Sequence, residues 1–124
     1  MADWRVPLSD LSYDETEEHA LLDVLRSRWV SSGPRLATFE QEFAAATETA
    51  HAVGVSSATA ALHLSFLALG LGAGDEVIQP ALNFVATANM TRASGATPVF
   101  ADFASPDRPW ISAQTVEARL TTRT

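Results

Sequence analysis

The sequence contains no cysteine. Disulfides and zinc sites with thiolate ligands are therefore excluded, and cysteine usage leaves the redox compartment open. Long apolar runs are also missing, since no stretch approaches the roughly 20 residues that a membrane-spanning helix needs. The first residues, Met1 to Arg5, lack the basic and then apolar pattern of an export signal. Together these absences predict a cytoplasmic protein with no membrane partner.

Positive charge is scarce and of one kind. All eight basic residues are arginine, lysine is absent, and 15 acidic residues bring the net charge to −7. Nucleic acids and anionic membrane surfaces are bound through basic patches, so neither is expected as a partner. His63 has no second histidine or carboxylate at metal-ligand spacing, His51 is expected to be a packed or edge residue, and we predict no metal site.

What the sequence does contain is an alternation of short β-branched runs and longer Ala/Leu-rich runs. Its 124 residues, 47% of them hydrophobic, are enough for one domain. The order strand, helix, strand, helix, strand is typical of a parallel sheet covered by helices, so the expected fold class is α/β with a βαβαβ sheet. The five elements are expected at Ala52–Val55, Ala60–Leu69, Val77–Pro80, Phe84–Ala93 and Thr97–Asp102.

The amino-terminal part predicts an extended lead-in followed by a helix. A strand is possible at Trp4–Leu8, where a proline argues against helix. Ser12 and Glu15 have the spacing of a capping box, which would open a helix over Asp14–Arg28. Leucines and valines recur on one face of this helix, acidic residues occupy its first turn, and arginines occupy its last, as the helix dipole favours.

A second helix is predicted at Arg35–Thr47, and its two aromatic residues, Phe39 and Phe43, are expected in the core. We therefore divide the chain into a helical segment, residues 1–50, and an α/β region, residues 51–124. At the far end, a short helix capped by a serine is predicted at 115–120, with Ser112 or Ser105 as the cap.

The turn between the first predicted strand and its helix has the features of an anion site. A helix that begins directly after a strand directs unpaired N–H groups and the positive end of its dipole at one point. Ser57 and Thr59 can add hydroxyl donors, and the small Ala58 leaves room for a phosphate group.

Ligands of parallel α/β sheets bind at the carboxyl ends of the strands. The turn Ser56–Thr59, the segment Gln79–Phe84 and Asp102 are therefore expected at one edge of the sheet. Phe84 is placed there to stack on a flat cofactor, and ordinary core packing is the alternative.

Four segments, in this order and spacing, closely resemble the DegT/DnrJ family of pyridoxal-phosphate-dependent sugar aminotransferases. The resemblance implies the aspartate aminotransferase fold, which is type I, with this chain forming two amino-terminal helices and part of the large domain. It begins near Trp29 and continues to the last residue. The segments are Ser57–Leu64, Gly74–Ile78, Asn83–Asn89 and Gly95–Asp102.

The resemblance implies pyridoxal 5'-phosphate as cofactor. Ser57, Ala58 and Thr59 match the part of the family motif that holds the phosphate group, and Phe84 matches the aromatic residue that covers the pyridine ring. The pyridine-pairing acid of the family follows a later strand, so Asp102 is not given that role.

The resemblance also implies the substrates, a nucleotide-linked keto-sugar and an amino-acid donor such as glutamate. Trp29 and Ser32, in a Ser-Gly-Pro turn, match a loop that approaches the sugar and the partner subunit, while core packing of Trp29 stays an equal alternative. Asn83 is a further candidate for substrate contact, or else a helix cap. The family builds its active site from two subunits, so a homodimer is expected of the complete protein.

No catalytic residue is assigned. The family links its cofactor to a lysine amine, and arginine cannot replace it because its guanidinium is too basic and delocalised. The chain alone is therefore expected to be inactive, as the amino-terminal fragment of an aminotransferase. A related sugar dehydratase, with histidine in place of the lysine, stays open.

Two hypotheses come from other classes. A Rossmann-type nucleotide-binding half-domain would need a glycine-rich fingerprint after the first strand, and Val53–Ala58 does not supply one. A non-catalytic remnant, or a fragment that depends on a partner, would expose the apolar edge of an incomplete sheet and be prone to aggregate.

Overall fold

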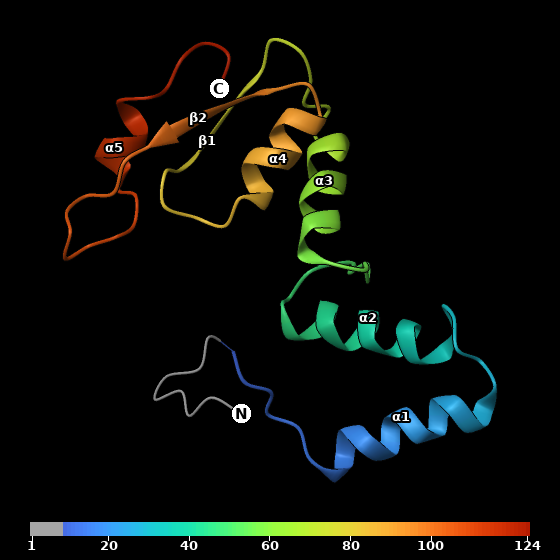
Figure 1. Ribbon diagram of the computed structural model, residues 1–124. Helices are drawn as coiled ribbons and strands as arrows, with labels where there is room; N and C mark the ends of the chain where they lie inside the picture. Colours follow the sequence, from blue (N-terminus) through green and yellow to red (C-terminus); the bar gives the residue numbers. More distant parts are fainter. Residues whose placement is uncertain (1–8) are drawn as a thin grey trace. The chain divides into compact units, whose positions relative to one another are not determined.

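The computed structural model describes residues 9–124 (Figure 1). The chain divides into two compact units, Met1–Gly54 and Val55–Thr124. The strand considered at Trp4–Leu8 lies outside the described residues. No helix within 9–124 combines the length and the apolar character needed to cross a bilayer.

The first unit contains the helices α1 (Glu15–Ser27) and α2 (Pro34–Ala46). The predicted capping box at Ser12 and Glu15 is wrong, because Asp14 caps α1 and Glu17 completes the box. The Asp14 carboxylate accepts a hydrogen bond from Thr16 N (2.8 Å), and the Glu17 carboxylate accepts one from Asp14 N (2.8 Å). The N–H of Thr16 stabilises the charged form, which lowers the pKa of Asp14 below its ordinary 3.8.

The aromatic residues of α2 do not form the core that the sequence predicted. Phe39 and Phe43 remain 54% and 52% exposed, and they pack on each other with ring centroids 5.8 Å apart. The only buried residue of α1 and α2 is Ala44. α1 and α2 contact each other too little to enclose a large side chain.

The second unit contains α3 (Ala58–Ala68), β1 (Glu76–Pro80), α4 (Ala86–Ala93), β2 (Thr97–Ala101) and the short α5 (Ala113–Glu117). β1 and β2 pair in parallel, with Glu76 opposite Thr97 and Pro80 opposite Ala101. α4 is the crossover between them and packs on both strands, and α3 packs on α4 (Figure 1). The predicted second and third strands and all five helices are confirmed, with small shifts at their ends.

The first predicted strand, Ala52–Val55, is wrong. The residues are β-branched and apolar, but a strand exists only where a neighbour completes its hydrogen-bond ladder. The sheet of the described residues has two strands, and neither pairs with this segment. The predicted βαβαβ order is therefore observed as α3, β1, α4, β2.

The core of the second unit is small. Its fully enclosed residues are Thr91, Ala96 and Ala101, with Gln79 and Ala86 nearly so. α3 was predicted to be buried, yet none of its residues is, and Leu64 and Leu67 are about half exposed. α3 is apolar all round but contacts α4 on one side, so the described residues cover only part of its surface.

A buried carboxylate ties the end of the chain to the start of β1. Glu76 is 9% exposed and accepts hydrogen bonds from Thr121 Oγ1 (2.6 Å) and from the guanidinium of Arg123. Glu76 N also donates to the Arg123 carbonyl (2.8 Å). The cation and hydroxyl compensate for the desolvation of the carboxylate.

Candidate functional site

The first turn of α3 has the geometry of an anion receptor. Ser57 is the N-cap in an extended conformation, and its hydroxyl oxygen accepts a hydrogen bond from Ala60 N (3.1 Å). Ala58 and Thr59 are the first two helical residues, so their N–H groups have no intrahelical acceptor. Ser57 and Ala58 are exposed, and the Ser57 hydroxyl keeps its proton for donation. Three donors can therefore converge on one anion.

The loop between β1 and α4 presents an aromatic ring. Phe84 is 76% exposed, so core packing of its ring is wrong for the described chain. Asn83 Oδ1 accepts a hydrogen bond from Phe84 N (2.8 Å) and thereby shapes the loop. Asn83 does not cap the next helix, because α4 has Val85 at its N-cap and no side-chain cap. The amide nitrogen of Asn83 is left for another partner.

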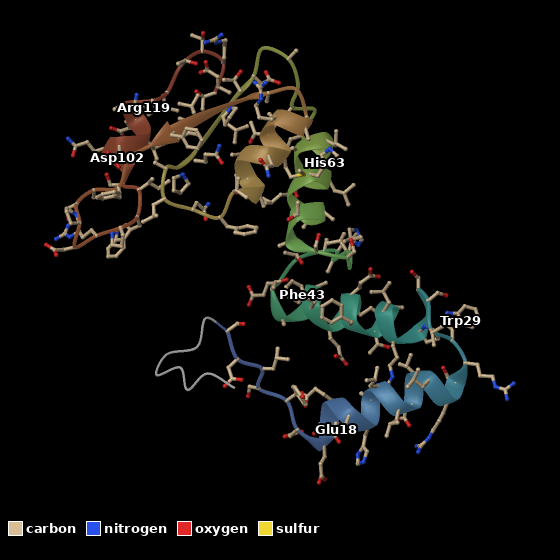
Figure 2. All side chains as sticks on the ribbon, viewed as in Figure 1. Glu18, Trp29, Phe43, His63, Asp102 and Arg119 are labelled. Carbon is tan, nitrogen blue, oxygen red and sulfur yellow. The ribbon has the colours of Figure 1, made fainter. Side chains whose placement is uncertain are left out.

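The helix start and the aromatic loop each precede one of two helices that pack on each other. Figure 1 shows α3 and α4 side by side and running the same way. Asp102 follows β2, and its carboxylate accepts a hydrogen bond from Phe103 N (2.9 Å) (Figure 2). The loop at Asn83–Phe84 and Asp102 follow β1 and β2 at their carboxyl ends, while the place of Ser57–Thr59 at the same edge stays a prediction.

Trp29 and Ser32 lie in the turn between α1 and α2, within the first unit. The indole N–H of Trp29 donates to the Ser32 carbonyl (2.7 Å), and the ring is 59% exposed (Figure 2). The core-packed alternative for Trp29 is therefore wrong in this unit. The turn borders a groove of about 920 Å³, on whose wall Arg35 and Asp23 form an exposed ion pair (3.5 Å).

Two polar residues near these segments make contacts, or lack them, in ways that the sequence did not indicate. Glu40, on α2, accepts a hydrogen bond from Gly54 N (2.8 Å) across 14 residues. Gln79, on β1, is 3% exposed, and its side-chain Nε2 has no hydrogen-bond partner in the described chain. Glutamate on a helix and glutamine in a strand are ordinary by type, and only the folded backbone reveals their surroundings. Across residues 9–124, no three His, Asp or Glu side chains gather as metal ligands.

The fold and this edge define a class of protein, the α/β proteins that bind ligands at the carboxyl edge of a parallel sheet. Residues 11–124 match the DegT/DnrJ/EryC1/StrS aminotransferase family, and the chain belongs to this family. One relative is the UDP-4-amino-4-deoxy-L-arabinose–oxoglutarate aminotransferase of Shewanella sediminis, with 43% identity over 119 residues. The alignment includes 96% of this chain and 30% of the relative, so the chain spans about a third of that enzyme's length.

Solved structures have the same fold. A candidate sugar aminotransferase of Streptococcus pneumoniae, Spr1654, superposes with a TM-score of 0.86 at 33% identity, over 97% of this chain and 30% of its own. That protein has been solved in apo, PMP and PLP forms. An aminotransferase of Psychrobacter cryohalolentis superposes with a TM-score of 0.84 at 34% identity, over 95% and 30% of the two chains.

The residues of these two segments fit a phosphorylated, planar cofactor. The first turn of α3 offers hydrogen-bond donors with no acidic side chain at Ser57, Ala58 or Thr59. The exposed ring of Phe84, in the loop after β1, is large enough to cover a pyridine. The chain has no lysine, so it has no side-chain amine that could bind such a cofactor covalently.

Proposed function

We propose that the complete protein to which these residues belong is a PLP-dependent aminotransferase. It transfers an amino group from an amino acid such as glutamate to a nucleotide-linked keto-sugar. The observation that carries the proposal is the 43% identity with an enzyme named for this chemistry. Spr1654, which the chain matches at 33% identity, has been solved in PLP and PMP forms, and this supports the choice of cofactor.

In this proposal, the first turn of α3 binds the cofactor phosphate. The N–H groups of Ala58 and Thr59 and the Ser57 hydroxyl donate hydrogen bonds, and the helix dipole adds a favourable field. Phe84 stacks on the pyridine ring and keeps water from that face. The chemistry supplied there by bound PLP would be acceptance of the amino group and delocalisation of electrons at the amino-acid carbon.

Substrate contacts are assigned to Trp29, Ser32 and Asn83. The exposed indole of Trp29 offers a flat apolar surface, and the free amide nitrogen of Asn83 can donate to a hydroxyl or phosphate oxygen. The lysine that carries the cofactor, the acid that pairs with the pyridine nitrogen, and a partner subunit are proposed to come from outside these 124 residues. The protein is proposed to be a cytoplasmic homodimer.

The test uses the complete protein expressed from its own gene. With glutamate and a UDP-linked 4-keto-sugar, we expect formation of 2-oxoglutarate and of an amino-sugar, together with the absorbance of bound PLP. Phe84→Ala should weaken PLP binding by roughly tenfold, as expected for a lost stacking partner. Leu82→Ala, in the same loop and 64% exposed, is the matched control.

Two outcomes would replace the proposal. A sugar product that has lost oxygen without gaining nitrogen would indicate the related dehydratase. Failure to bind PLP and to turn over any keto-sugar would indicate a non-catalytic remnant, and so would a protein whose mass equals the 13.2 kDa of this chain.

A further inference from the structure

One edge of the strand β1 faces away from its partner strand. In a parallel pair, alternate residues of a strand turn their N–H and C=O groups toward the same neighbour. Thr97 N donates to Asp75 O (2.9 Å), so Asp75 and the odd-numbered residues of β1 face β2. Glu76, Ile78 and Pro80 therefore face the opposite edge. The sheet of residues 9–124 has two strands, so no strand in this part of the chain pairs with Ile78 there.

Arg123 lies at the start of this opposite edge. Its carbonyl accepts a hydrogen bond from Glu76 N (2.8 Å). The Glu76 carboxylate in turn accepts hydrogen bonds from Thr121 Oγ1 (2.6 Å) and from the Arg123 guanidinium. Because Glu76 is buried and both of its side-chain partners belong to the turn at 121–124, the backbone of Arg123 is held at the first position of the edge.

The direction of pairing follows from the second backbone group of Arg123. In an antiparallel pair, two residues that are hydrogen-bonded to each other exchange both N–H···O bonds. Arg123 N donates to Thr121 Oγ1 (3.0 Å), so it returns no bond to Glu76 O. This one-sided bond is the pattern of a parallel pair, in which the next bond to Glu76 O comes from the second residue beyond Arg123. That residue is the first one after Thr124.

We propose that the free edge of β1 binds a third, parallel strand formed by the residues that directly follow Thr124 in the complete protein. The inference rests on the proposal above that these 124 residues belong to a longer protein. Glu76 lies opposite Thr124 in this pairing, and Ile78 lies opposite the second residue after Thr124. The N–H and C=O groups of Glu76 and Ile78 form the ladder, and Pro80 ends it because proline has no N–H.

Amide hydrogen exchange tests whether the edge is occupied. It is measured at single residues in the complete protein and in the 124-residue chain. Val77 and Gln79 are the internal controls, because their N–H groups face β2 in both proteins. Relative to these two amides, the Ile78 amide should exchange roughly tenfold more slowly in the complete protein, the effect of one backbone hydrogen bond.

A double-mutant cycle in the complete protein tests which segment occupies the edge. Ile78→Pro removes the N–H that faces the third strand and leaves the bonds to β2, while Ile78→Ala keeps this N–H and is the matched control. The second change places a proline at the first residue after Thr124, whose N–H is proposed to bind Glu76 O. In urea unfolding, the second proline should lower the folding equilibrium constant by about threefold less in Ile78→Pro than in Ile78→Ala, because both prolines disrupt one ladder. The exchange measurement decides the question if Ile78→Pro does not fold.

The outcomes distinguish this inference from the proposed function. An Ile78 amide that exchanges equally fast in both proteins would overturn the inference. Equal costs of the second proline in both backgrounds would also overturn it, and would assign the edge to another segment or to a second copy of the chain. Neither readout involves PLP or a sugar, so an inactive complete protein with coupled prolines would overturn the proposed function alone. A natural protein of 13.2 kDa would overturn both.

Discussion

At the scale of single residues, the turn between α1 and α2 depends on a glycine that touches an indole. A Cβ at Gly33 would lie 2.2 Å from Trp29 Nε1, which is far inside van der Waals contact. The indole N–H can reach the Ser32 carbonyl only because this space is empty. The orientation of Trp29, the proposed substrate contact, is therefore fixed by its neighbour at position 33.

Gly33→Ala is expected to displace the Trp29 ring and break its hydrogen bond. The cost should be about 0.5–1.5 kcal/mol, the usual worth of one such bond. Tryptophan fluorescence, measured with the other two tryptophans replaced by phenylalanine, should shift to the red. Gly72→Ala is the control, because its added Cβ meets only Ser94 O at 3.9 Å. An unchanged spectrum would contradict this account of the turn.

The buried carboxylate of Glu76 carries a charge that the guanidinium of Arg123 compensates. The Glu76 side chain is 8% exposed whereas the Arg123 side chain is 63% exposed. Arg123→Ala would leave the carboxylate with Thr121 as its side-chain donor. We expect a loss of about 1–3 kcal/mol in the free energy of unfolding, the cost of an uncompensated buried group.

A double-mutant cycle on the same chain tests this explanation. Glu76→Gln removes the charge, so Arg123→Ala should cost much less in that background. Urea unfolding of the four proteins measures the coupling. Equal costs of Arg123→Ala in both backgrounds would mean that the ion pair contributes nothing to stability.

At the scale of elements, the side chain of Ser57 has two roles at the amino end of α3. Ser57 accepts a hydrogen bond from Ala60 N, which stabilises the helix, and its hydroxyl proton is proposed to bind phosphate. A substitution that removes the hydroxyl affects both tasks. Substitutions that keep the cap but change the charge can separate them.

Ser57→Ala should lower stability by about 0.5–2 kcal/mol, as loss of an N-cap does. Ser57→Asp should keep the cap and the stability, because aspartate caps helices as well as serine does, yet it should repel phosphate. Thermal unfolding measures the first effect, and phosphate titration measures the second. If Ser57→Asp bound phosphate as tightly as the unmodified chain, the turn would not be the anion site. Ser65→Ala, on the exposed middle of α3, is the control.

At the scale of the whole molecule, apolar surface exceeds what the described residues can cover. Leu64, Leu67 and Leu69 in and after α3 are each more than half exposed, and the α3 sequence is apolar on every side. Monomeric proteins rarely expose apolar patches beyond a few hundred Å². The relative from Shewanella sediminis is about three times as long as the aligned part, and its remaining residues are proposed to correspond to the cover that α3 lacks.

The isolated 124-residue chain should therefore bind the apolar dye ANS and self-associate. Replacing Leu64 and Leu67 together by glutamine should reduce association in sedimentation velocity. Leu11→Gln, at a residue that is 79% exposed and outside the helices, should not. A monomeric chain with a sharp, cooperative thermal transition would contradict this prediction.

Sequence patterns predicted most of the elements because their signals are local. The parallel pair of β1 and β2 with α4 between them follows from two short β-branched runs and a helical run. Burial could not be predicted in the same way. Phe39, Phe43 and the residues of α3 have core-like composition, but exposure depends on what other parts of a protein cover them.

The same distinction between local signals and long-range contacts applies to the candidate site. The loop at Phe84 could be placed at the carboxyl end of β1 because parallel topology constrains it, whereas the helix start at Ser57–Thr59 follows no strand of the described chain and its place at that edge stays a prediction. The use of Asn83 to shape its own loop, and the hold of Glu40 on Gly54, depend on contacts that no spacing rule encodes. The roles of Ser57, Thr59, Phe84, Trp29 and Ser32 in binding stay predictions.

The sequence by itself determined the helices, the two paired strands, the family and the lack of a lysine, because propensity, periodicity, motif spacing and composition are properties of the chain. Tertiary structure decided the rest. Val53 and its neighbours are β-prone but form no strand, because hydrogen-bond ladders need a partner. In the same way, the exposure of Phe84 and the pairing of Glu76 with Arg123 follow from which distant residues meet.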